Sequence, residues 1–466
     1  MVRGAILLLA TMAMGSGPEV GFRDQVAPIL VDRCLACHGP KKASANFRVD
    51  TFARLMADSD AGKNIEPGKP DESLFLDLIV LTEPTGRMPK NADSLPKGEV
   101  EILRRWIEQG AKSGGIDPNA DLAGLVAKAR RPAAPAVYRT PVPISTLAFR
   151  PDGAELAIGG YHEVTIWDPS TGKLLRRIPG LAQRTQGLAY NADGSVLAIA
   201  GGTPGESGEL VLADPRGTQP PRFVASAPDI LLAVAFSPDG SLVATSGADR
   251  TLRVHEVASG KELCQVKQFA DWVTGVAFDR EGSTVAGSSS DKLVKVFDAR
   301  TGKLLTTYIG HGEPVLAVAF DPDSTRAISA GADRKLHVWD PKVIAAEDGT
   351  AAQQEERFKK ELSTRMIDGF GDDVLDLVAS RGFVFSASAD GKVRQHELAS
   401  GRLVRSFDGP GDWAYSLAVE PAGKILAVGG FDGGVRVYHL EDGREVARFV
   451  AAPGLGSTVG RQDEAN

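Results

Sequence analysis

A dipeptide position that recurs along this 466-residue chain, most often as an aromatic residue or histidine followed by an acidic residue, constrains the fold more than any other feature. It recurs about every 42 residues from near Val142 onward, and two of the steps are longer because residues are inserted. A unit of this size buries its apolar face only against neighbouring copies of itself, so the repeat predicts an array of similar units. The dipeptides are Trp167-Asp168, Ala213-Asp214, His255-Glu256, Phe297-Asp298, Trp339-Asp340, His396-Glu397 and Tyr438-His439.

Short apolar stretches and turn sequences fill each repeat. One turn has the form Pro-Asp-Gly, as at 151–153 and 238–240, and a later turn carries an aspartate. Four strands in each of seven repeats predict an all-β, seven-bladed propeller over residues 137–453. The turn aspartates are Asp249, Asp291, Asp333, Asp390 and Asp432.

The fifth repeat carries four residues that point to a structural network. His311, Ser329, Asp333 and Trp339 resemble the hydrogen-bond network of WD40 repeats, and the region from about residue 137 onward is similar to that family. The resemblance implies that His311 and Asp333 are structural, because a buried histidine, carboxylate and indole must satisfy one another. Histidines at related sites of other repeats are expected to pack rather than to bind metal: His255, His396 and His439.

The last repeat poses a question of ring closure. Residues 444–450 can supply its outer strand, and residues 137–141 offer an alternative. Closure must leave no free sheet edge. We favour the C-terminal strand.

The pentapeptide at 34–38, Cys-Leu-Ala-Cys-His, is typical of a c-type haem attachment site. The thiols of Cys34 and Cys37 can form thioether bonds to the haem, and His38 can ligate the iron. One such motif predicts one covalent haem c and one-electron chemistry. A redox disulfide would sit in a βαβ pattern, which is lacking here, and a zinc site needs more ligands than the distant Cys264 offers.

Apolar residues on both sides of this motif predict a small all-α domain over residues 18–115. Phe22, Val26, Ile29 and Leu30 recur at helical spacing before the motif, and a second apolar stripe runs through residues 99–110. Two terminal helices packed through an aromatic contact resemble class I cytochromes c. The whole chain is therefore expected to be multidomain, with this helical domain first and the propeller second.

A second iron ligand is expected from the chain between these helices. Met88 lies in a loop, and the adjacent Pro89 restricts the backbone and can hold the sulfur toward iron. A buried packing methionine is the alternative interpretation of Met88. Met56 lies in a stretch of helical composition and is expected to belong to the core.

The segment around these residues resembles the Planctomycete-type cytochrome c domain. The matching residues include the stretch 34–40, the tripeptide 87–89 and Trp106-Ile107. The resemblance implies haem c and electron carriage, with partner proteins undefined. Lys90 stands where many members have a second proline, which is a minor departure.

The N-terminal residues have the layout of a secretory signal peptide over residues 1–17. Arg3 precedes an apolar run at 5–14, which is too short to span a bilayer, and small residues follow. An uncleaved anchor is the alternative. Cytochromes c mature on the exported side of a bacterial membrane, so we expect a periplasmic or otherwise exported protein with no transmembrane segment. The net charge of −7 gives no basic footprint and argues against nucleic acid as a partner.

The remaining segments are assigned from composition. An Ala/Pro-rich linker is expected at 116–136, an inserted helical segment at 341–367 and a disordered tail at 454–466. The insertion is either a docking element or a solvated helix on a long loop.

Two tryptophans are candidates for partner binding. Trp272 and Trp413 occupy equivalent positions where the first strand of a blade begins, and aromatic residues there can anchor a protein. Ordinary packing between blades is the alternative.

Three function classes remain open. The first is an exported electron carrier whose propeller docks redox partner proteins, and we favour it over an enzyme. The second is a redox enzyme with an active site or second cofactor in the propeller. The third is a non-catalytic scaffold that senses redox state.

Overall fold

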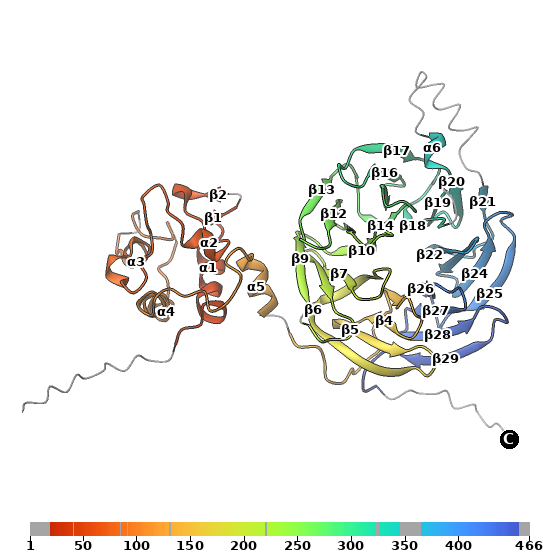
Figure 1. Ribbon diagram of the computed structural model, residues 1–466, viewed down its shortest axis with the longest axis horizontal. Helices are drawn as coiled ribbons and strands as arrows, with labels where there is room; N and C mark the ends of the chain where they lie inside the picture. The colour runs from red at the N-terminus through yellow and green to blue at the C-terminus, as the bar shows by residue number, and fades with distance from the viewer. Residues whose placement is uncertain are drawn as a thin grey trace, which may run out of the picture. The chain divides into compact units, whose positions relative to one another are not determined.

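The computed structural model describes residues 19–40, 42–83, 85–90, 92–129, 132–219, 221–322, 326–344 and 365–455. The chain divides into two compact units at residues 130 and 131 (Figure 1). The predicted signal peptide, the centre of the predicted insertion and most of the predicted tail lie outside the described residues. Within the described part, no helix is long and apolar enough to cross a membrane.

The first unit is mainly helical. Its helices are built around one apolar core, and its only described sheet is a two-stranded ribbon. The elements in chain order are η1 (Phe22–Val26), α1 (Ala27–Arg33), β1 (His38–Gly39), β2 (Lys42–Ala43), η2 (Ser44–Asn46), α2 (Phe52–Leu55), η3 (Pro70–Glu72), α3 (Leu74–Val80), α4 (Lys97–Glu108) and α5 (Leu122–Ala129).

An aromatic contact joins the two ends of this unit. The ring centroids of Phe22 and Trp106 lie 5.4 Å apart, and both side chains are buried. Leu103 and Ile107 complete the apolar stripe of α4, as its spacing predicts. The indole N–H of Trp106 donates to the carbonyl of Lys112 at 2.9 Å, which satisfies the polar end of a buried ring. The class I-like packing expected from the sequence is therefore present.

The predicted linker at 116–136 is wrong over part of its length. Helix α5 lies inside it, and Leu122 and Val126 are buried in the core of the first unit. Their spacing of four residues places both side chains on one helix face. The high alanine content concealed this short amphipathic helix because alanine suits linkers and helices equally well.

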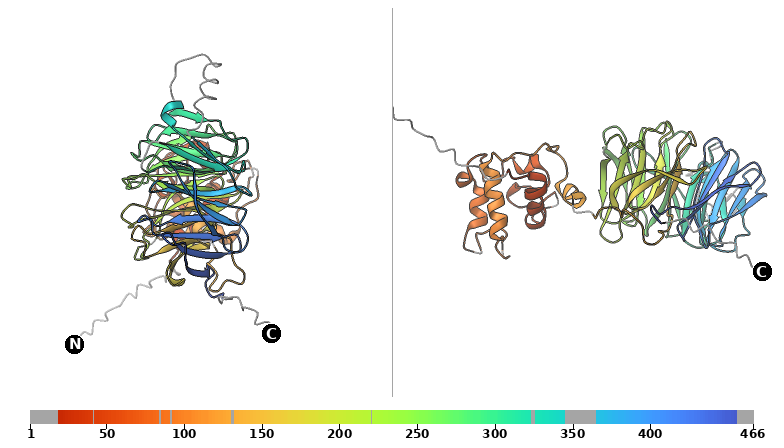
Figure 2. Two further views of the ribbon diagram at one scale, coloured as in Figure 1. Left: turned by 90° about the vertical axis from the view of Figure 1, so that its right-hand side faces the viewer. Right: turned by 90° about the horizontal axis from the view of Figure 1, so that it is seen from below.

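The second unit is a ring of seven four-stranded antiparallel blades (Figure 1). Each blade contains consecutive strands, and the long strand β6 serves as the outer strand of blade 1 and the inner strand of blade 2. The edge view shows the blades side by side around the ring (Figure 2). The predicted seven-bladed propeller is thus confirmed.

The strands of the ring follow the repeat closely. In chain order they are β3 (Leu147–Phe149), β4 (Leu156–Gly159), β5 (Tyr161–Asp168), β6 (Lys173–Tyr190), β7 (Leu197–Thr203), β8 (Ser207–Ala213), β9 (Arg222–Ala227), β10 (Leu231–Phe236), β11 (Leu242–Gly247), β12 (Leu252–Glu256), β13 (Glu262–Val266), β14 (Val273–Phe278), β15 (Thr284–Ser289), β16 (Val294–Asp298), β17 (Leu304–Tyr308), β18 (Val315–Phe320), β19 (Ala327–Gly331), β20 (Leu336–Trp339), β21 (Arg365–Ile367), β22 (Val374–Ser380), β23 (Phe383–Ser388), β24 (Lys392–Glu397), β25 (Leu403–Asp408), β26 (Ala414–Val419), β27 (Ile425–Gly430), β28 (Gly434–His439) and β29 (Glu445–Val450).

The ring closes without exchange of a strand between its ends. β29 pairs with β28 as the outer strand of blade 7, so the C-terminal strand closes this blade as expected. Blade 7 meets blade 1 through an apolar seam, in which the rings of Trp167 and Phe449 stack at a centroid distance of 5.0 Å. Hydrogen bonds cross the same seam, because Ser416 Oγ donates to the carbonyl of Ile144 at 2.6 Å.

The predicted insertion is shorter than its assigned range of 341–367. Helix α6 (Pro341–Ile344) opens it, and residues 365–367 form β21, the outer strand of blade 5. Three residues carry too little alternation to be recognised as a strand from sequence. The part of the predicted inserted helix at 351–362 lies outside the described residues.

Two buried histidines predict how the stability of the propeller depends on pH. Burial lowers the pKa of His255 and of His396 from 6.5 to about 4. The unfolded chain binds these protons first as the pH falls below about 6.5, so stability is lost between that pH and about 4. Each shift is worth a few kcal/mol at about 1.4 kcal/mol per pKa unit.

We expect His255→Phe combined with His396→Phe to flatten this dependence, because Phe297 already fills the equivalent position of blade 4. Thermal unfolding followed by circular dichroism at pH 7.5, 6 and 5 tests this. An equal loss of Tm with falling pH in the wild type and in the double variant would show that these two histidines do not cause the pH dependence.

Candidate functional site

The Cys-x-x-Cys-His stretch forms one tight turn at the end of α1. The backbone N–H of Cys34 donates to the carbonyl of Leu30, and those of Cys37 and His38 donate to the carbonyl of Cys34, all at 3.0–3.1 Å. Helix α1 is fixed in the core by Leu30, which is fully buried. The turn thus places two thiols and an imidazole on a rigid support.

A backbone hydrogen bond orients the His38 ring. Its Nδ1 lies 3.1 Å from the carbonyl oxygen of Phe47, and this nitrogen must be the donor because a carbonyl can only accept. The lone pair of Nε2 is then left for a metal, which is the arrangement that positions histidine ligands in metal sites. The ring of Phe47 also meets the ring of His38 edge to face, at a centroid distance of 5.2 Å.

A cavity of about 430 Å³ opens beside this turn. Its volume lies within the range of cofactor pockets. Apolar side chains from α3 and the neighbouring loops supply most of its wall, and the two cysteines, His38 and Met88 all reach it. The apolar lining residues are Phe47, Leu74, Phe75, Leu78, Ile79 and Leu95.

Met88 reaches the cavity from a loop that is tied down on both sides. Its backbone N–H donates to the carbonyl of Leu78 in α3 at 2.8 Å, and Arg87 Nη2 donates to the carbonyl of Ala92 at 2.8 Å. The Met88–Pro89 peptide bond is cis. Met56, in contrast, packs against the core of the unit and does not line the cavity. The structure therefore brings Met88, and not Met56, to the cavity that holds Cys34, Cys37 and His38.

The donor set fits a haem c better than the other groups that Cys-x-x-Cys pairs bind. Cys34 and Cys37 are free thiols, and burial raises the pKa of Cys34 to about 12. A catalytic redox pair would need a lowered pKa instead. A structural zinc site would need four nitrogen, sulfur or carboxylate ligands, and the only His and Cys residues lining this cavity are Cys34, Cys37 and His38. A large apolar wall with an imidazole and a thioether suits a planar iron macrocycle.

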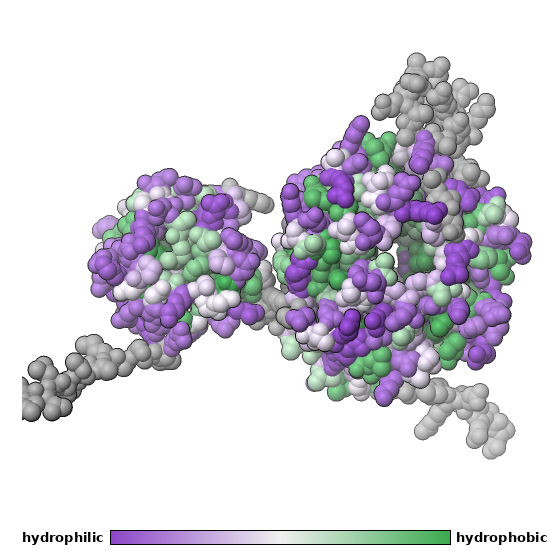
Figure 3. Space-filling model, viewed as in Figure 1, coloured by the Kyte–Doolittle hydropathy of each residue, from purple (hydrophilic) through white to green (hydrophobic). Residues whose placement is uncertain are grey.

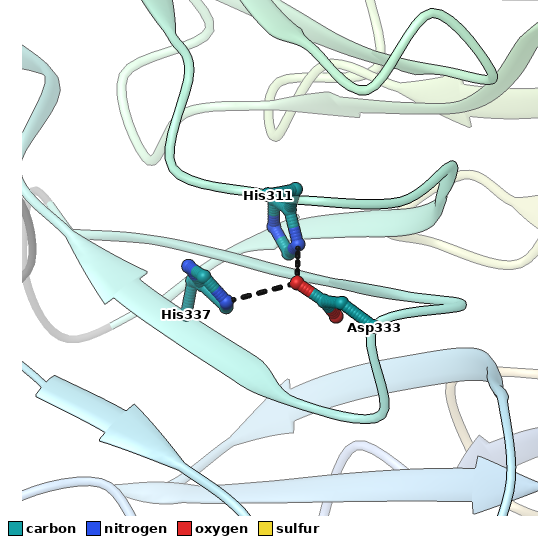
Figure 4. Close-up of side chains that lie close together, drawn as sticks. All are labelled: His311, Asp333 and His337. Atoms are coloured by element: carbon teal, nitrogen blue, oxygen red, sulfur yellow. Dashed lines mark hydrogen bonds and ion pairs between the residues drawn. The ribbon is translucent and has the colours of Figure 1, made fainter.

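A second cluster of metal-binding residue types lies in blade 5. His311, Asp333 and His337 place their ligand atoms within 4.8 Å of one another (Figure 4). Asp333 Oδ2 lies 2.7 Å from Nδ1 of His311 and 3.1 Å from Nε2 of His337. Although burial opposes ionisation, these two contacts hold the pKa of Asp333 well below its usual range.

Contacts within the propeller reach the four imidazole nitrogens of this cluster. The other nitrogen of His311 lies 2.7 Å from Ser329 Oγ, which also accepts from the Trp339 indole at 3.2 Å, and the Tyr308 hydroxyl lies 2.8 Å from Nδ1 of His337. Three of the nitrogens are thus hydrogen-bonded, whereas Nε2 of His337 makes no hydrogen bond and approaches Asp333 Oδ2 at 3.1 Å. The cluster is a network of hydrogen bonds and close polar contacts that fixes blade 5.

Sequence reasoning found four members of this network and missed two. Tyr308 ends β17 of blade 4 and lies three residues before His311, and His337 lies in β20 between Asp333 and Trp339 in sequence. His337 stacks on His311 at a centroid distance of 3.9 Å. The four-residue spacing from Asp333 to His337 was the available signal.

The two candidate partner-binding tryptophans are exposed. Trp272 and Trp413 expose 53% and 40% of their surface, so ordinary packing between blades does not account for them. They lie before the inner strands of blades 4 and 7, as the repeat predicts. One face of the propeller is hollowed at its centre and carries apolar areas between polar side chains (Figure 3).

Two protein families match separate parts of the chain. Residues 34–92 match the family described as Planctomycete cytochrome C. Residues 222–256, 260–298, 302–340 and 401–439 match the family described as WD domain, G-beta repeat. The first match contains all four residues that reach the cavity as candidate haem ligands.

Curated relatives resemble parts of the chain. An uncharacterized WD repeat-containing protein, sll1491, of Synechocystis sp. is 32% identical over 119 residues, which are 25% of this chain and 33% of that protein. The probable serine/threonine-protein kinase PkwA of Thermomonospora curvata is 43% identical over 61 residues, 13% of this chain and 8% of that protein. WD repeat-containing protein 18 of Bos taurus is 31% identical over 134 residues, 27% of this chain and 31% of that protein.

The chain thus spans a third or less of the length of each of these relatives. The family matches agree with the folds of the two units, one helical and one a ring of four-stranded blades. The chain therefore joins a Planctomycete-type cytochrome c domain to a propeller of WD40 repeats.

Proposed function

We propose that this protein carries single electrons through one covalently bound haem c and docks its redox partner on the propeller. The observation that carries the proposal is the single apolar cavity reached by Cys34, Cys37, His38 and Met88. A haem c bound there would exchange one electron between its ferric and ferrous states.

The residues of the cavity have separate roles in this proposal. Cys34 and Cys37 would hold the macrocycle by thioether bonds, and His38 and Met88 would supply ligands to its iron. The apolar wall excludes water, and a thioether ligand raises the reduction potential. The hydrogen bond from His38 to the Phe47 carbonyl keeps the imidazole in the ligating orientation.

Export follows from the same proposal. Haem c is attached on the exported side of a bacterial membrane, and the N-terminal residues have the layout of a signal peptide. We therefore place the mature protein in the periplasm or another exported compartment.

The alternative of a redox enzyme requires a second cofactor or an acid–base site in the propeller. In the histidine–aspartate cluster of blade 5, three of the four imidazole nitrogens are hydrogen-bonded within the propeller. An optical spectrum that shows any chromophore besides one haem c per chain would favour the enzyme. A redox-sensing scaffold would differ from a carrier by slow electron exchange with partners.

Covalent attachment predicts a mass that survives denaturation. The mature protein should carry the mass of one haem, and Cys34→Ala combined with Cys37→Ala should lose it because both thioether bonds are absent. Cys264→Ala is the control, since that thiol lies in the propeller between blades and should leave the haem attached. Intact-protein mass spectrometry in denaturant measures both. A Cys34–Cys37 disulfide in the mature protein would contradict the proposal.

Ligation by Met88 predicts a change of spectrum and potential. Met88→Ala should keep the haem attached but abolish the weak methionine–iron charge-transfer band of the ferric protein. The potential should fall, because a thioether favours the ferrous state. Met56→Ala is the matched control and should leave both unchanged. If the band persists in Met88→Ala, Met88 is not the ligand.

Docking on the propeller predicts that loss of the exposed tryptophans lowers partner affinity without lowering the stability of the propeller. Trp272→Ala combined with Trp413→Ala should leave Tm nearly unchanged, because surface substitutions typically cost within about 0.5 kcal/mol. Affinity for a partner protein should fall by about 2 kcal/mol or more if either ring is an anchor. Trp167→Ala is the contrast, since this buried ring stacks on Phe449 and its loss should lower Tm. Unfolding of the double variant would show that the exposed rings are structural.

A further inference from the structure

We propose that an aromatic cluster on blade 7, formed by Trp413, Tyr415 and Phe431 beside Asp412, binds a lysine or arginine side chain of a basic segment in the docked partner. This inference rests on the proposed docking function and names the chemistry that the partner must present.

The ring of Phe431 joins the cluster by contacting both other rings. The ring of Phe431 lies 5.3 Å from that of Trp413 and 5.9 Å from that of Tyr415, measured between centroids. Trp413 and Phe431 expose 40% and 46% of their surface. The cluster therefore offers exposed aromatic surface, and the face of an aromatic ring carries the negative part of its quadrupole.

The cluster departs from the repeat at each of its positions. One backbone hydrogen bond recurs between the residue before the inner strand and the residue after the second strand, and it identifies equivalent residues from blade to blade. The pairs are Ile230 and Ala248, Trp272 and Ser290, Pro314 and Ala332, Asp373 and Ala389, and Trp413 and Phe431. Only blade 7 has an aromatic residue at both positions of such a pair.

The position of Tyr415 follows the same pattern. The inner strands of blades 3 to 7 each have a register shift next to their start, and the shifted residue of blade 7 is Tyr415. The corresponding residues of blades 3 to 6 are Leu232, Thr274, Leu316 and Leu375. The repeat fold does not require an aromatic residue at any of these three positions, since blades 3, 5 and 6 form without one there and blade 4 has only Trp272.

The cluster lies beside an acidic residue that lacks the basic partner found at equivalent positions of other blades. In blades 3, 4 and 5 a basic residue with a positive backbone φ follows the turn aspartate. These residues are Arg250, Lys292 and Arg334. Lys292 lies 3.4 Å from Glu313 of the next blade, and Arg334 lies 3.4 Å from Asp372 of the next blade.

Glycine replaces this cation in blade 6. A Cβ on Gly391 would lie 2.9 Å from the carbonyl oxygen of Asp412, so the turn still abuts the loop that carries the acid. Asp412 follows the pattern of Glu313 and Asp372 but has no cation within 4.0 Å among the described residues. The partner would supply the missing charge.

The occupant that fits is therefore a guanidinium or ammonium group. Such a group is attracted to aromatic faces within about 6 Å, and an adjacent carboxylate strengthens its binding. The loops 408–413 and 431–433 contain three aspartates and neither lysine nor arginine, which disfavours an acidic partner.

Full-length protein labelled with 5-fluorotryptophan tests the inference by ¹⁹F NMR. The probes are three decapeptides of alternating glycine with arginine, citrulline or glutamate. The arginine peptide should shift the Trp413 resonance, assigned by its loss in Trp413→Phe. Citrulline has the shape of arginine without its charge, so the affinity of the citrulline peptide should be lower than that of the arginine peptide by roughly fivefold or more. The glutamate peptide should not shift the resonance.

Blade 4 provides the matched control within the same spectrum. Trp272 follows Asp271 as Trp413 follows Asp412, but its aromatic neighbours are replaced by Thr274 and Ser290. The Trp272 resonance should shift less than that of Trp413. Tyr415→Thr combined with Phe431→Ser gives blade 7 the residues that blade 4 already accommodates, and it should reduce arginine-peptide affinity roughly fivefold. Asp412→Asn should weaken binding without changing the rings.

Equal shifts by the arginine and citrulline peptides, no shift by any peptide, or an unchanged affinity in the blade-4-like variant would overturn the inference. These outcomes would not bear on docking itself, which is measured by partner affinity of the Trp272 and Trp413 alanine variants. A partner that binds through Trp413 but not through a cation would leave the docking proposal intact.

Discussion

The ring of the propeller depends on the seam between its last and first blades. Many closed sheets interlock their ends by exchanging a strand, but here each blade is built from consecutive strands. The stacked rings of Trp167 and Phe449 and the buried side chain of Ile144 close the seam. The segment before the first blade reinforces it, because Tyr138 donates to Glu163 at 2.7 Å and its N–H donates to the carbonyl of Pro453. A closed ring is what presents the loops of seven blades on one rigid surface.

The repeat made the propeller predictable in detail. Blade number and the closing strand follow from the regular spacing of turns and apolar stretches, since each blade solves the same packing problem. The four members of the blade 5 network were likewise recognisable from their fixed positions. Tyr308 and His337 were not, because Tyr308 lies in the outer strand of blade 4 and meets His337 of blade 5 only through the packing of neighbouring blades. Helix α5 was missed because alanine-rich sequence suits two structures equally.

The haem site was predictable for the opposite reason. Cys34, Cys37 and His38 lie within one helical turn, so their convergence is a local property of sequence. Met88 lies far from them in the chain, and only the folded unit brings it to the same cavity. The hydrogen bond between His38 and the Phe47 carbonyl is also a tertiary feature. The two units thus divide the proposed function, with electron chemistry in the cavity of one and recognition on the loops of the other.

The central claim is that His38 and Met88 would both ligate the iron of one haem bound in the cavity. Iron K-edge X-ray absorption on the purified wild-type protein tests it directly, because sulfur and nitrogen scatterers differ in both distance and phase. The account predicts five nitrogen scatterers, four from the macrocycle and one from His38, and one thioether sulfur. A first shell of nitrogen or oxygen alone, without sulfur, would contradict it.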